Sequence, residues 1–413
     1  MPALHRQLSA VLLAVLAGCV SQPRYEELPP AQLEPAPPRP ITVVASHLAA
    51  VPQPTPSPLA NLIMGRSPPP PAVPPVKVPS LGKNNVQPFQ PSLARQATQG
   101  CQPLEKPRPI PPPSPSKPVP VAAPVSTNLN FRQIIALQTL LDRQNFSCNC
   151  ADGKIGSRTR AALHAFQAAA GLPTTGTPNG TTIAVLGDFG SAFIAYTVTE
   201  DDHTQLTQNP TTWLDKSQVA RLGYLTILET VAERGHATQQ AIRDLNPQVT
   251  MWPDPPAGTT LTVPDVGSNE KFPHAARIRI SIGNKLIRVF DDAGKQVAQF
   301  PCSIARDPAK REPCEISVAV VAPNPNYTFD PALFSEEPES ATIKTKLIIP
   351  AGPRNPVGVA WIGLSKSGYG MHGTPKPEDI GKTESHGCFR LANWNAQKLL
   401  RMVDVGTPVS VEE

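Results

Sequence analysis

Apolar residues recur at helical spacing in one part of the chain and alternate with polar residues in another, which predicts two kinds of folded domain. From 128 to 190 the spacing is three or four residues, as at Leu137 and Leu141, and it predicts a small helical bundle. From 274 to 413 the pattern alternates in RIRISI, KLIRVFDD, KQVAQFPCSI and EISVAVVA, which predicts a β-rich domain. One helix is expected late in that domain, with Asn393 as its cap.

A third folded region, residues 194 to 266, combines both patterns. The alternating segment AYTVTEDD predicts a strand, two helices are expected after it, and TTLTVP predicts a closing strand. Thr226 and Glu229 form a capping-box pattern at the first helix, and Thr238 can cap the second. About thirty residues separate the first strand from the first helix.

The start of the chain reads as an export signal over residues 1 to 18. Its apolar run LSAVLLAVLA is too short for a mature membrane helix, which needs ~20 residues. The run ends in Leu16-Ala17-Gly18-Cys19, which resembles the lipobox of bacterial lipoproteins, where the signal is cut before a cysteine that then carries lipid. Val20 follows, and by resemblance to Gram-negative lipoproteins this favours the outer membrane. An ordinary signal peptide that contains a cysteine is the alternative.

Residues 19 to 127 are rich in proline, since about 30 of the 53 prolines in the chain fall here. Charged residues make up only 17% of the whole chain. Such a segment cannot build a packed core and favours polyproline II. At ~3.1 Å per residue, a hundred residues would reach on the order of 100 Å when extended. We therefore expect a disordered tether that lets the folded domains work away from a membrane. A spacer with no required reach is the alternative.

Seven cysteines in an exported chain need separate explanations. Cys302 and Cys314 could face each other across a strand pair, since an oxidising compartment permits a disulfide. Cys148 and Cys150 are separated by one residue, which suits neither a zinc CxxC motif nor an easy disulfide. A pairing of either with Cys101 is conceivable, because connectivity cannot be deduced from spacing.

Cys388 lies in KTESHGCFRLANW, between a histidine and an arginine. A thiol attacks as thiolate, so a nucleophilic cysteine needs a nearby base or cation. His386 is only two residues away and is expected to project in another direction. His372 lies sixteen residues earlier in GYGMHGTPKP, a stretch whose glycines and prolines predict a loop that can fold back. These residues favour a Cys/His hydrolase or transferase over a buried inert cysteine or an incomplete zinc site.

The run HGTPKPEDIGKTESHGCFRL resembles the active-site signature of the L,D-transpeptidases, the YkuD-type domain. The likeness extends over residues 274 to 413 and includes PNPNYTFDP and NPVGVAWIGLSKSGYGMHGTP. Phe389 replaces the usual isoleucine or valine, and REPCEISV stands where many members have a Thr-Pro-x-Gly turn. The resemblance implies a mainly-β, β-sandwich-like catalytic domain within a multidomain protein.

The resemblance also assigns roles to residues. Cys388 is the implied nucleophile, His372 the base that takes its proton, and the Gly373 carbonyl the group that orients the imidazole. Backbone N–H groups around Gly387 and Cys388 are expected to receive the oxyanion of the tetrahedral intermediate. Further side chains are expected to line the site, to hold its loop or to form its walls: Ser385, His386, Arg390, Trp361 and Tyr369.

The implied reaction is acyl transfer in two steps. Cys388 attacks the carbonyl between the third residue of a tetrapeptide stem and its terminal D-Ala, and an amine then takes the acyl group from the thioester. The amine belongs to a second stem, which gives a 3→3 cross-link, or to a lysine of a wall-attached lipoprotein. Water as acceptor would make the enzyme an L,D-carboxypeptidase, and an anchor with an inactive β domain is the non-enzymatic alternative.

Two further resemblances concern wall binding. The run DGKIGSRTRAALHAFQAAAGLPTTG resembles the three-helix peptidoglycan-binding domain, over residues 128 to 190. Residues 194 to 266 resemble a LysM carbohydrate-binding module, with the thirty-residue stretch as the departure and a plain α+β subdomain as the alternative. The expected partners are peptidoglycan stems and glycan, a wall-attached lipoprotein, and the membrane through lipid at Cys19. No cofactor, metal or nucleic-acid partner is expected.

Overall fold

The computed structural model describes residues 128–413, except 209, 268–271, 309–310, 335–336, 384 and 386. All of them belong to one compact unit, Leu81–Glu413. The predicted signal, Cys19, the tether and Cys101 lie outside the described residues, and so does His386. Within the part of the chain that is described, none of the helices has the length and apolar character needed to cross a membrane.

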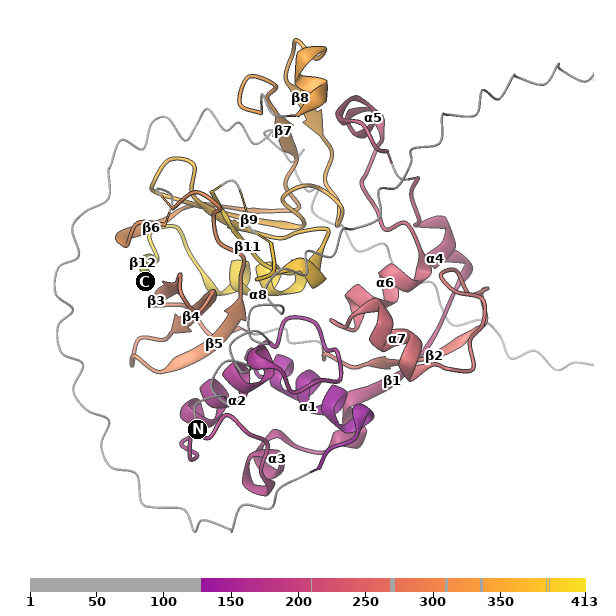
Figure 1. Cartoon of the computed structure of the whole chain (residues 1–413), viewed down its shortest axis with the longest axis vertical. Helices are drawn as coiled ribbons and strands as arrows, with labels where there is room; N and C mark the ends of the chain where they lie inside the picture. Colours follow the sequence, from indigo (N-terminus) through magenta and orange to yellow (C-terminus); the bar gives the residue numbers. More distant parts are fainter. Residues whose placement is uncertain are drawn as a thin grey trace, which may run out of the picture. The chain divides into compact units, whose positions relative to one another are not determined.

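The predicted helical bundle forms from three helices (Figure 1): α1 Phe131–Arg143, α2 Ser157–Ala169 and α3 Gly180–Leu186. Asn130 begins α1 with a capping box, since its side chain accepts from the Gln133 backbone N–H and the Gln133 side chain accepts from the Asn130 N–H. The predicted stripe is buried, with Leu137 and Leu141 both fully enclosed. Its apolar side chains pack between α1, α2 and α3.

The buried amide of Gln138 explains the DGxxGxxT pattern of this bundle. Its Nε2 donates to Asp152 Oδ1 at 2.8 Å and to Thr159 Oγ1 at 3.0 Å, and its Oε1 accepts from the Gly153 backbone N–H at 3.0 Å. Gly153 has φ +70° and a Cβ there would lie 2.2 Å from the Phe131 ring, so only glycine fits this turn. Each residue of the pattern therefore supports the turn between α1 and α2.

The middle region has the predicted order of strand, two helices and strand. The two strands pair antiparallel, and the helices between them pack on them. Thr226 and Thr238 cap their helices by accepting from the Glu229 and Ala241 N–H groups, as predicted. The thirty-residue stretch contains two short helices, α4 and α5. The elements are β1 Phe193–Thr197, α4 Glu200–Thr204, α5 Trp213–Gln218, α6 Ile227–Arg234, α7 Gln239–Leu245 and β2 Thr260–Pro264.

The β-rich domain contains an eight-stranded mixed sheet in the order β11-β10-β9-β6-β12-β3-β4-β5. Strand pairs β3–β12 and β10–β11 are parallel, and the other neighbours are antiparallel. A separate hairpin joins β7 to β8. The strands are β3 Arg277–Ser281, β4 Leu286–Phe290, β5 Gln296–Pro301, β6 Cys314–Pro323, β7 Tyr327–Phe329, β8 Leu347–Ile349, β9 Ala360–Leu364, β10 Gly370–His372, β11 Phe389–Arg390 and β12 Pro408–Glu412.

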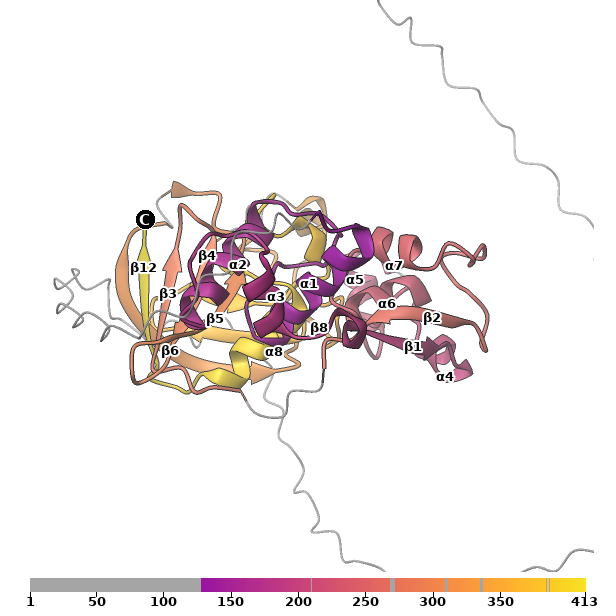
Figure 2. The same ribbon diagram turned by 90° about the horizontal axis from the view of Figure 1, so that it is seen from below.

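Strand β6 curls this sheet. Its first half pairs with β12 and its second half with β9, and the register shifts between Val318 and Val320. The two halves of one sheet therefore face each other across the core, seen from a second side in Figure 2. The mainly-β expectation is confirmed, and its sandwich-like form comes from one curled sheet, because the ten-residue β6 is continuous through both halves.

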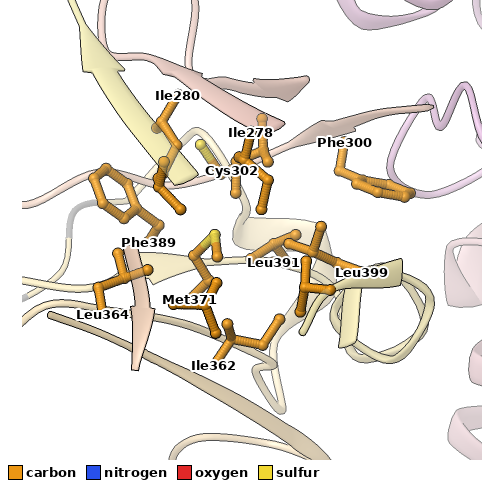
Figure 3. Packing of buried hydrophobic residues seen from close by; sticks show 14 of the residues in the cluster. Ile278, Ile280, Phe300, Cys302, Ile362, Leu364, Met371, Phe389, Leu391 and Leu399 are labelled. Carbon is orange, nitrogen blue, oxygen red and sulfur yellow. The ribbon is translucent and has the colours of Figure 1, made fainter. Parts of the chain in front are cut away.

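The core of this domain lies between the two halves of the curled sheet and helix α8 Asn393–Met402. Figure 3 shows Ile278 and Ile280 of β3 pointing toward Met371 and Phe389 of the opposite half. Burying each large apolar side chain contributes ~1.5–3 kcal/mol. Phe389 is 2% exposed, so the departure from isoleucine or valine is an apolar exchange in the core.

Two local possibilities for this domain are not realised. Cys302 and Cys314 are both buried in the core but do not form the disulfide that the sequence left open. Asn393 does not cap α8, whose N-cap is Ala392. The Asn393 amide instead donates to the Pro353 carbonyl at 3.0 Å, because this side chain turns into the protein and not along the helix axis.

A buried charged cluster links the helical bundle, the middle region and the β-rich domain. The Asp142 carboxylate of α1 contacts Lys398 Nζ of α8 and His236 Nδ1, both at 2.7 Å. The His236 ring stacks on Trp394 with centroids 4.8 Å apart. Burial acts to raise the pKa of Asp142, but Lys398 and His236 outweigh it and hold that pKa well below its ordinary value. His236 has no partner close to it in the sequence, and the fold brings it to this junction.

Replacing Asp142 by asparagine leaves the Lys398 ammonium buried without a countercharge. We expect Asp142→Asn to lower the free energy of unfolding by ~3–5 kcal/mol, measured by urea denaturation followed by circular dichroism. The control is Asp244→Asn, which removes an exposed carboxylate bonded to Gln240 and should change stability by under ~0.5 kcal/mol. Equal small effects of both variants would contradict a stabilising role for the cluster.

Candidate active site

Two adjacent parallel strands bring the predicted cysteine and histidine together. Met371 of β10 pairs with Phe389 of β11, and His372 pairs with Arg390. Met371 and Phe389 point into the core, so His372 points to the other face of the sheet. Cys388 directly precedes β11, and strand spacings place the Cα atoms of Cys388 and His372 on the order of 8 Å apart, a gap that their side chains can span.

The position of the thiol is fixed at the start of β10. Cys388 is partly exposed, and its Sγ lies 3.8 Å from the Gly368 carbonyl oxygen. His372 is the last residue of β10 and not part of a flexible loop, so the predicted loop is wrong at this position. The glycines and prolines that suggested a loop belong to the turns before and after this three-residue strand.

The imidazole of His372 is held in one orientation. Its Nδ1 lies 2.6 Å from the Gly373 carbonyl oxygen, which can only accept a hydrogen bond. Nδ1 therefore carries the proton and donates, which leaves the lone pair on Nε2 as a proton acceptor. Burial lowers the pKa of His372 to about 4, with a further lowering from Arg390 and an opposing effect of the Gly373 bond. The ring is thus a neutral base near pH 7.

Packing around Gly373 holds that carbonyl in place. A Cβ on Gly373 would lie 2.2 Å from Asn393 Oδ1 and 3.2 Å from the Gly358 Cα. Glycine is therefore required after His372 by close contact with α8 and with the segment before β9.

Trp361 and Tyr369, expected as walls, are both largely buried. Trp361 pairs with His372 across β9 and β10, and its ring stacks on the imidazole with centroids 5.6 Å apart. A Cβ on Gly370 would lie 2.6 Å from the indole, so this glycine makes room for the ring. Tyr369 is 6% exposed and lies under the Lys366 ammonium, 4.4 Å from its ring centre. Trp361 is therefore a buried side chain that covers one face of the imidazole, and little of it contacts solvent.

Ser385 shapes the turn before the cysteine. Its hydroxyl donates to the Cys388 carbonyl and accepts from the Gly387 N–H at 3.3 Å. The Gly387 N–H expected to face an oxyanion thus contacts Ser385 here, over a long bond. The zinc alternative required His386, which lies outside the described residues.

Arg390 lies close to both reactive groups. Its Nη2 donates to Thr383 Oγ1 at 2.9 Å, which ties β11 to the loop before Cys388. Burial lowers the pKa of Arg390, while Asp379 and Cys388 raise it. Because a guanidinium also favours an anion beside it, Arg390 supports a thiolate at Cys388 and disfavours a second positive charge on His372.

Tyr327 of β7 is a site residue to which sequence reasoning gave no role. Burial raises the pKa of its phenol, and the charge of Cys388 raises it further, so this side chain lies within electrostatic reach of the sulfur. The stretch PNPNYTFDP was part of the family likeness, and its aromatic residues were the available signal.

Two family models match the folded part of the chain. Residues 275–411 match the L,D-transpeptidase catalytic domain (YkuD), and residues 132–186 match the family described as "Putative peptidoglycan binding domain". Both matches fall inside the domains expected from sequence. Together they cover the helical bundle and the β-rich domain but not the middle region.

Curated relatives match mainly the catalytic region. "Putative L,D-transpeptidase YkuD" of Bacillus licheniformis is 26% identical over 184 residues, 45% of this chain and 92% of that protein. "Putative L,D-transpeptidase YqjB" of Bacillus subtilis is 35% identical over 104 residues, 24% of this chain and 50% of that protein.

Among solved structures, an L,D-transpeptidase from Mycobacterium smegmatis is 21% identical with a TM-score of 0.27, and covers 39% of this chain and 76% of that one. The catalytic family model and the curated relatives agree on an L,D-transpeptidase domain, and the second family model adds the peptidoglycan-binding domain. The chain therefore carries an L,D-transpeptidase catalytic domain together with a peptidoglycan-binding domain.

Proposed function

We propose that this protein is a cysteine-dependent L,D-transpeptidase of the cell envelope that contributes to cell-wall biogenesis. The observation that carries this proposal is the His372 imidazole on the strand beside Cys388, kept neutral by burial and oriented with Nε2 as acceptor by the 2.6 Å bond to Gly373. A fixed neutral base next to a partly exposed thiol is what a cysteine nucleophile needs.

In the first step, His372 Nε2 takes the proton of the Cys388 thiol. The sulfur attacks the carbonyl carbon between the third residue of a tetrapeptide stem and its terminal D-Ala. The resulting oxyanion accepts from backbone N–H groups at Cys388 and Gly387, the latter exchanging its 3.3 Å bond to Ser385 for the stronger one to an anion. The C–N bond then breaks, D-Ala leaves as an amine with the proton from His372, and a thioester remains.

In the second step, an amine attacks the thioester carbonyl while His372 takes its proton. The C–S bond breaks, the sulfur regains a proton from the imidazole, and an amide joins the stem to its acceptor. The acceptor is the side-chain amine of a second stem, which gives a 3→3 cross-link, or a lysine of a wall-attached lipoprotein. Water in place of the amine gives an L,D-carboxypeptidase.

The other regions would keep the enzyme at its polymer. The peptidoglycan-binding domain supports attachment to the wall, and the strand–helix–helix–strand order of residues 193–264 supports a LysM-like glycan-binding module. The sequence around Cys19 supports an exported precursor that is lipid-anchored in the outer membrane and works in the periplasm.

We expect Cys388→Ala and His372→Ala to abolish D-Ala release from a disaccharide-tetrapeptide. Removing either the nucleophile or its base should cost at least ~10³-fold in kcat, because the two groups act as a unit. The measurement is D-Ala release together with the intact mass of the protein, which gains the acyl group in the wild type only. Ser365→Ala, which removes a hydroxyl that accepts from the Ser317 N–H, is a control outside the site. D-Ala release by Cys388→Ala would contradict the proposal.

Product analysis of the same reaction separates the acceptors. Dimers with a 3→3 link indicate a second stem, lipoprotein-bearing fragments indicate a protein lysine, and tripeptides alone indicate water. Muropeptides from cells carrying wild type and Cys388→Ala give the same separation in the wall.

In the pH profile of activity, the loss on the acid side should occur below the ordinary pKa range of histidine. The base works unprotonated, and its pKa is lowered from 6.5 to about 4, so kcat/KM should persist as the pH falls past 6.5 and be lost only on approaching 4. The measurement is a pH profile of D-Ala release, with circular dichroism at each pH to confirm folding. An acid limb centred at 6.5 or above in folded protein would show that His372 is not the buried neutral base described.

A further inference from the structure

The thirty-residue stretch of the middle region packs against the catalytic domain. We call residues 210–226, which include α5, the arm. Figure 1 shows α5 beside the β7–β8 hairpin, far from β1 and β2 in the same region. Leu222 of the arm, Phe329 of β7 and Ile349 of β8 form one small buried apolar cluster. The arm therefore shares a core with the hairpin.

Trp213 is the main contact of the arm with the hairpin. Its ring stacks on Phe329 with centroids 4.3 Å apart and an interplanar angle of 11°, and it lies 5.9 Å from the Tyr327 ring. Its backbone N–H donates to Glu339 Oε2 at 2.8 Å. β7 and β8 pair over only three residues each, and so short a hairpin is marginal without further packing. Trp213 supplies that packing.

A second contact braces the chain between the hairpin and β9. The Leu222 N–H donates to the Ala351 carbonyl, and the Leu222 carbonyl accepts from the Arg354 N–H, both at 3.1 Å. Gly352 lies between them with φ +145°, and a Cβ there would lie 2.2 Å from the Leu222 carbonyl oxygen. Only glycine permits this approach of the two backbones.

Both contacts lead to the active site. Tyr327 of the hairpin lies within electrostatic reach of Cys388. Pro353, beside Gly352, accepts from the Asn393 amide at 3.0 Å, and Asn393 Oδ1 packs against Gly373, whose carbonyl holds His372. The arm thus supports the hairpin on the nucleophile side and the segment that packs on the base side.

We propose that Trp213 and Leu222 are positioning residues for transpeptidation, through which the middle region holds the β7–β8 hairpin in the geometry that binds the donor stem. This inference rests on the proposed function. It makes the arm part of the working enzyme, although neither residue touches the reacting atoms. The middle region then couples wall binding to activity because the same region carries the arm.

The test compares Trp213→Ala with Trp213→Phe and Leu214→Ala in the full chain. Leu214 follows Trp213 on α5 and is 48% exposed, so it is a matched control. Two rates are measured: D-Ala release from a disaccharide-tetrapeptide, and alkylation of Cys388 by iodoacetamide, located by peptide mass. D-Ala release needs the positioned hairpin, whereas alkylation by iodoacetamide needs only the Cys388 thiol and the His372 base.

Trp213→Ala should lower kcat/KM for D-Ala release by about tenfold, the value of one lost aromatic stack. Its iodoacetamide rate should stay equal to wild type, since alkylation needs only the Cys388 thiol and the His372 base. Trp213→Phe should recover most of the activity, and Leu214→Ala should match wild type. Hydrogen exchange of residues 327–334 should quicken in Trp213→Ala only.

The outcomes separate this inference from the proposed function. Wild type that releases no D-Ala overturns the proposed function itself. Active wild type with an equally active Trp213→Ala overturns the role of the arm alone, as does an equal loss of both rates. If Trp213→Ala does not fold, Glu339→Ala removes the acceptor of the Trp213 N–H on the hairpin side, and the same split between the two rates is required of it.

Discussion

The hydrogen bond between the His372 ring and the Gly373 carbonyl is the constraint on which the proposed chemistry depends. It selects the tautomer, aims Nε2 away from the core, and does so in a buried place where a charged ring is disfavoured. The bond exists because Gly373 has no side chain, since any Cβ would meet Asn393. A backbone carbonyl cannot titrate, so this orienting group keeps its character at every pH, unlike the carboxylate of a serine-protease triad.

The sheet supplies the rest of the geometry. Because β10 and β11 run parallel, the fifteen residues between His372 and Cys388 form a crossover that returns to the same edge. Because β6 curls, the core closes under this edge of the sheet. His372 and Cys388 are therefore next in the chain to Met371 and Phe389, whose side chains pack in that core. Trp361 covers the ring from β9. Reactive side chains at strand ends are held more firmly than they would be on a loop.

Much of this was predictable from the sequence. Helical spacing located α1 and α2, alternation located the β-rich domain, and the HG and SHGC motifs pointed to His372 and Cys388. The curled sheet was not predictable, because periodicity gives the faces of strands but not their order or their bends. The missing Cys302–Cys314 disulfide shows the same limit, since two cysteines can share a core without facing each other.

The site was less predictable where it depends on distant contacts. Tyr327 and Trp213 come from segments that look irregular in sequence, and they meet only because the arm reaches across the fold. The role of His236 could not be predicted from sequence, since its partners Asp142 and Trp394 lie about ninety or more residues away. Such pairings arise from packing between regions, which no local pattern records.

The cluster of Asp142, Lys398 and His236 bears on how this architecture can change over evolution. One carboxylate of the bundle binds partners from two other regions, all three of which sequence patterns treat as separable. A catalytic region transplanted alone would bring Lys398 without the carboxylate that it binds. A recombination event that moves the catalytic domain must therefore also move the helical bundle, or else mutations in α8 must replace Lys398. Recombination breakpoints between residues 190 and 274 should accordingly be disfavoured in this lineage.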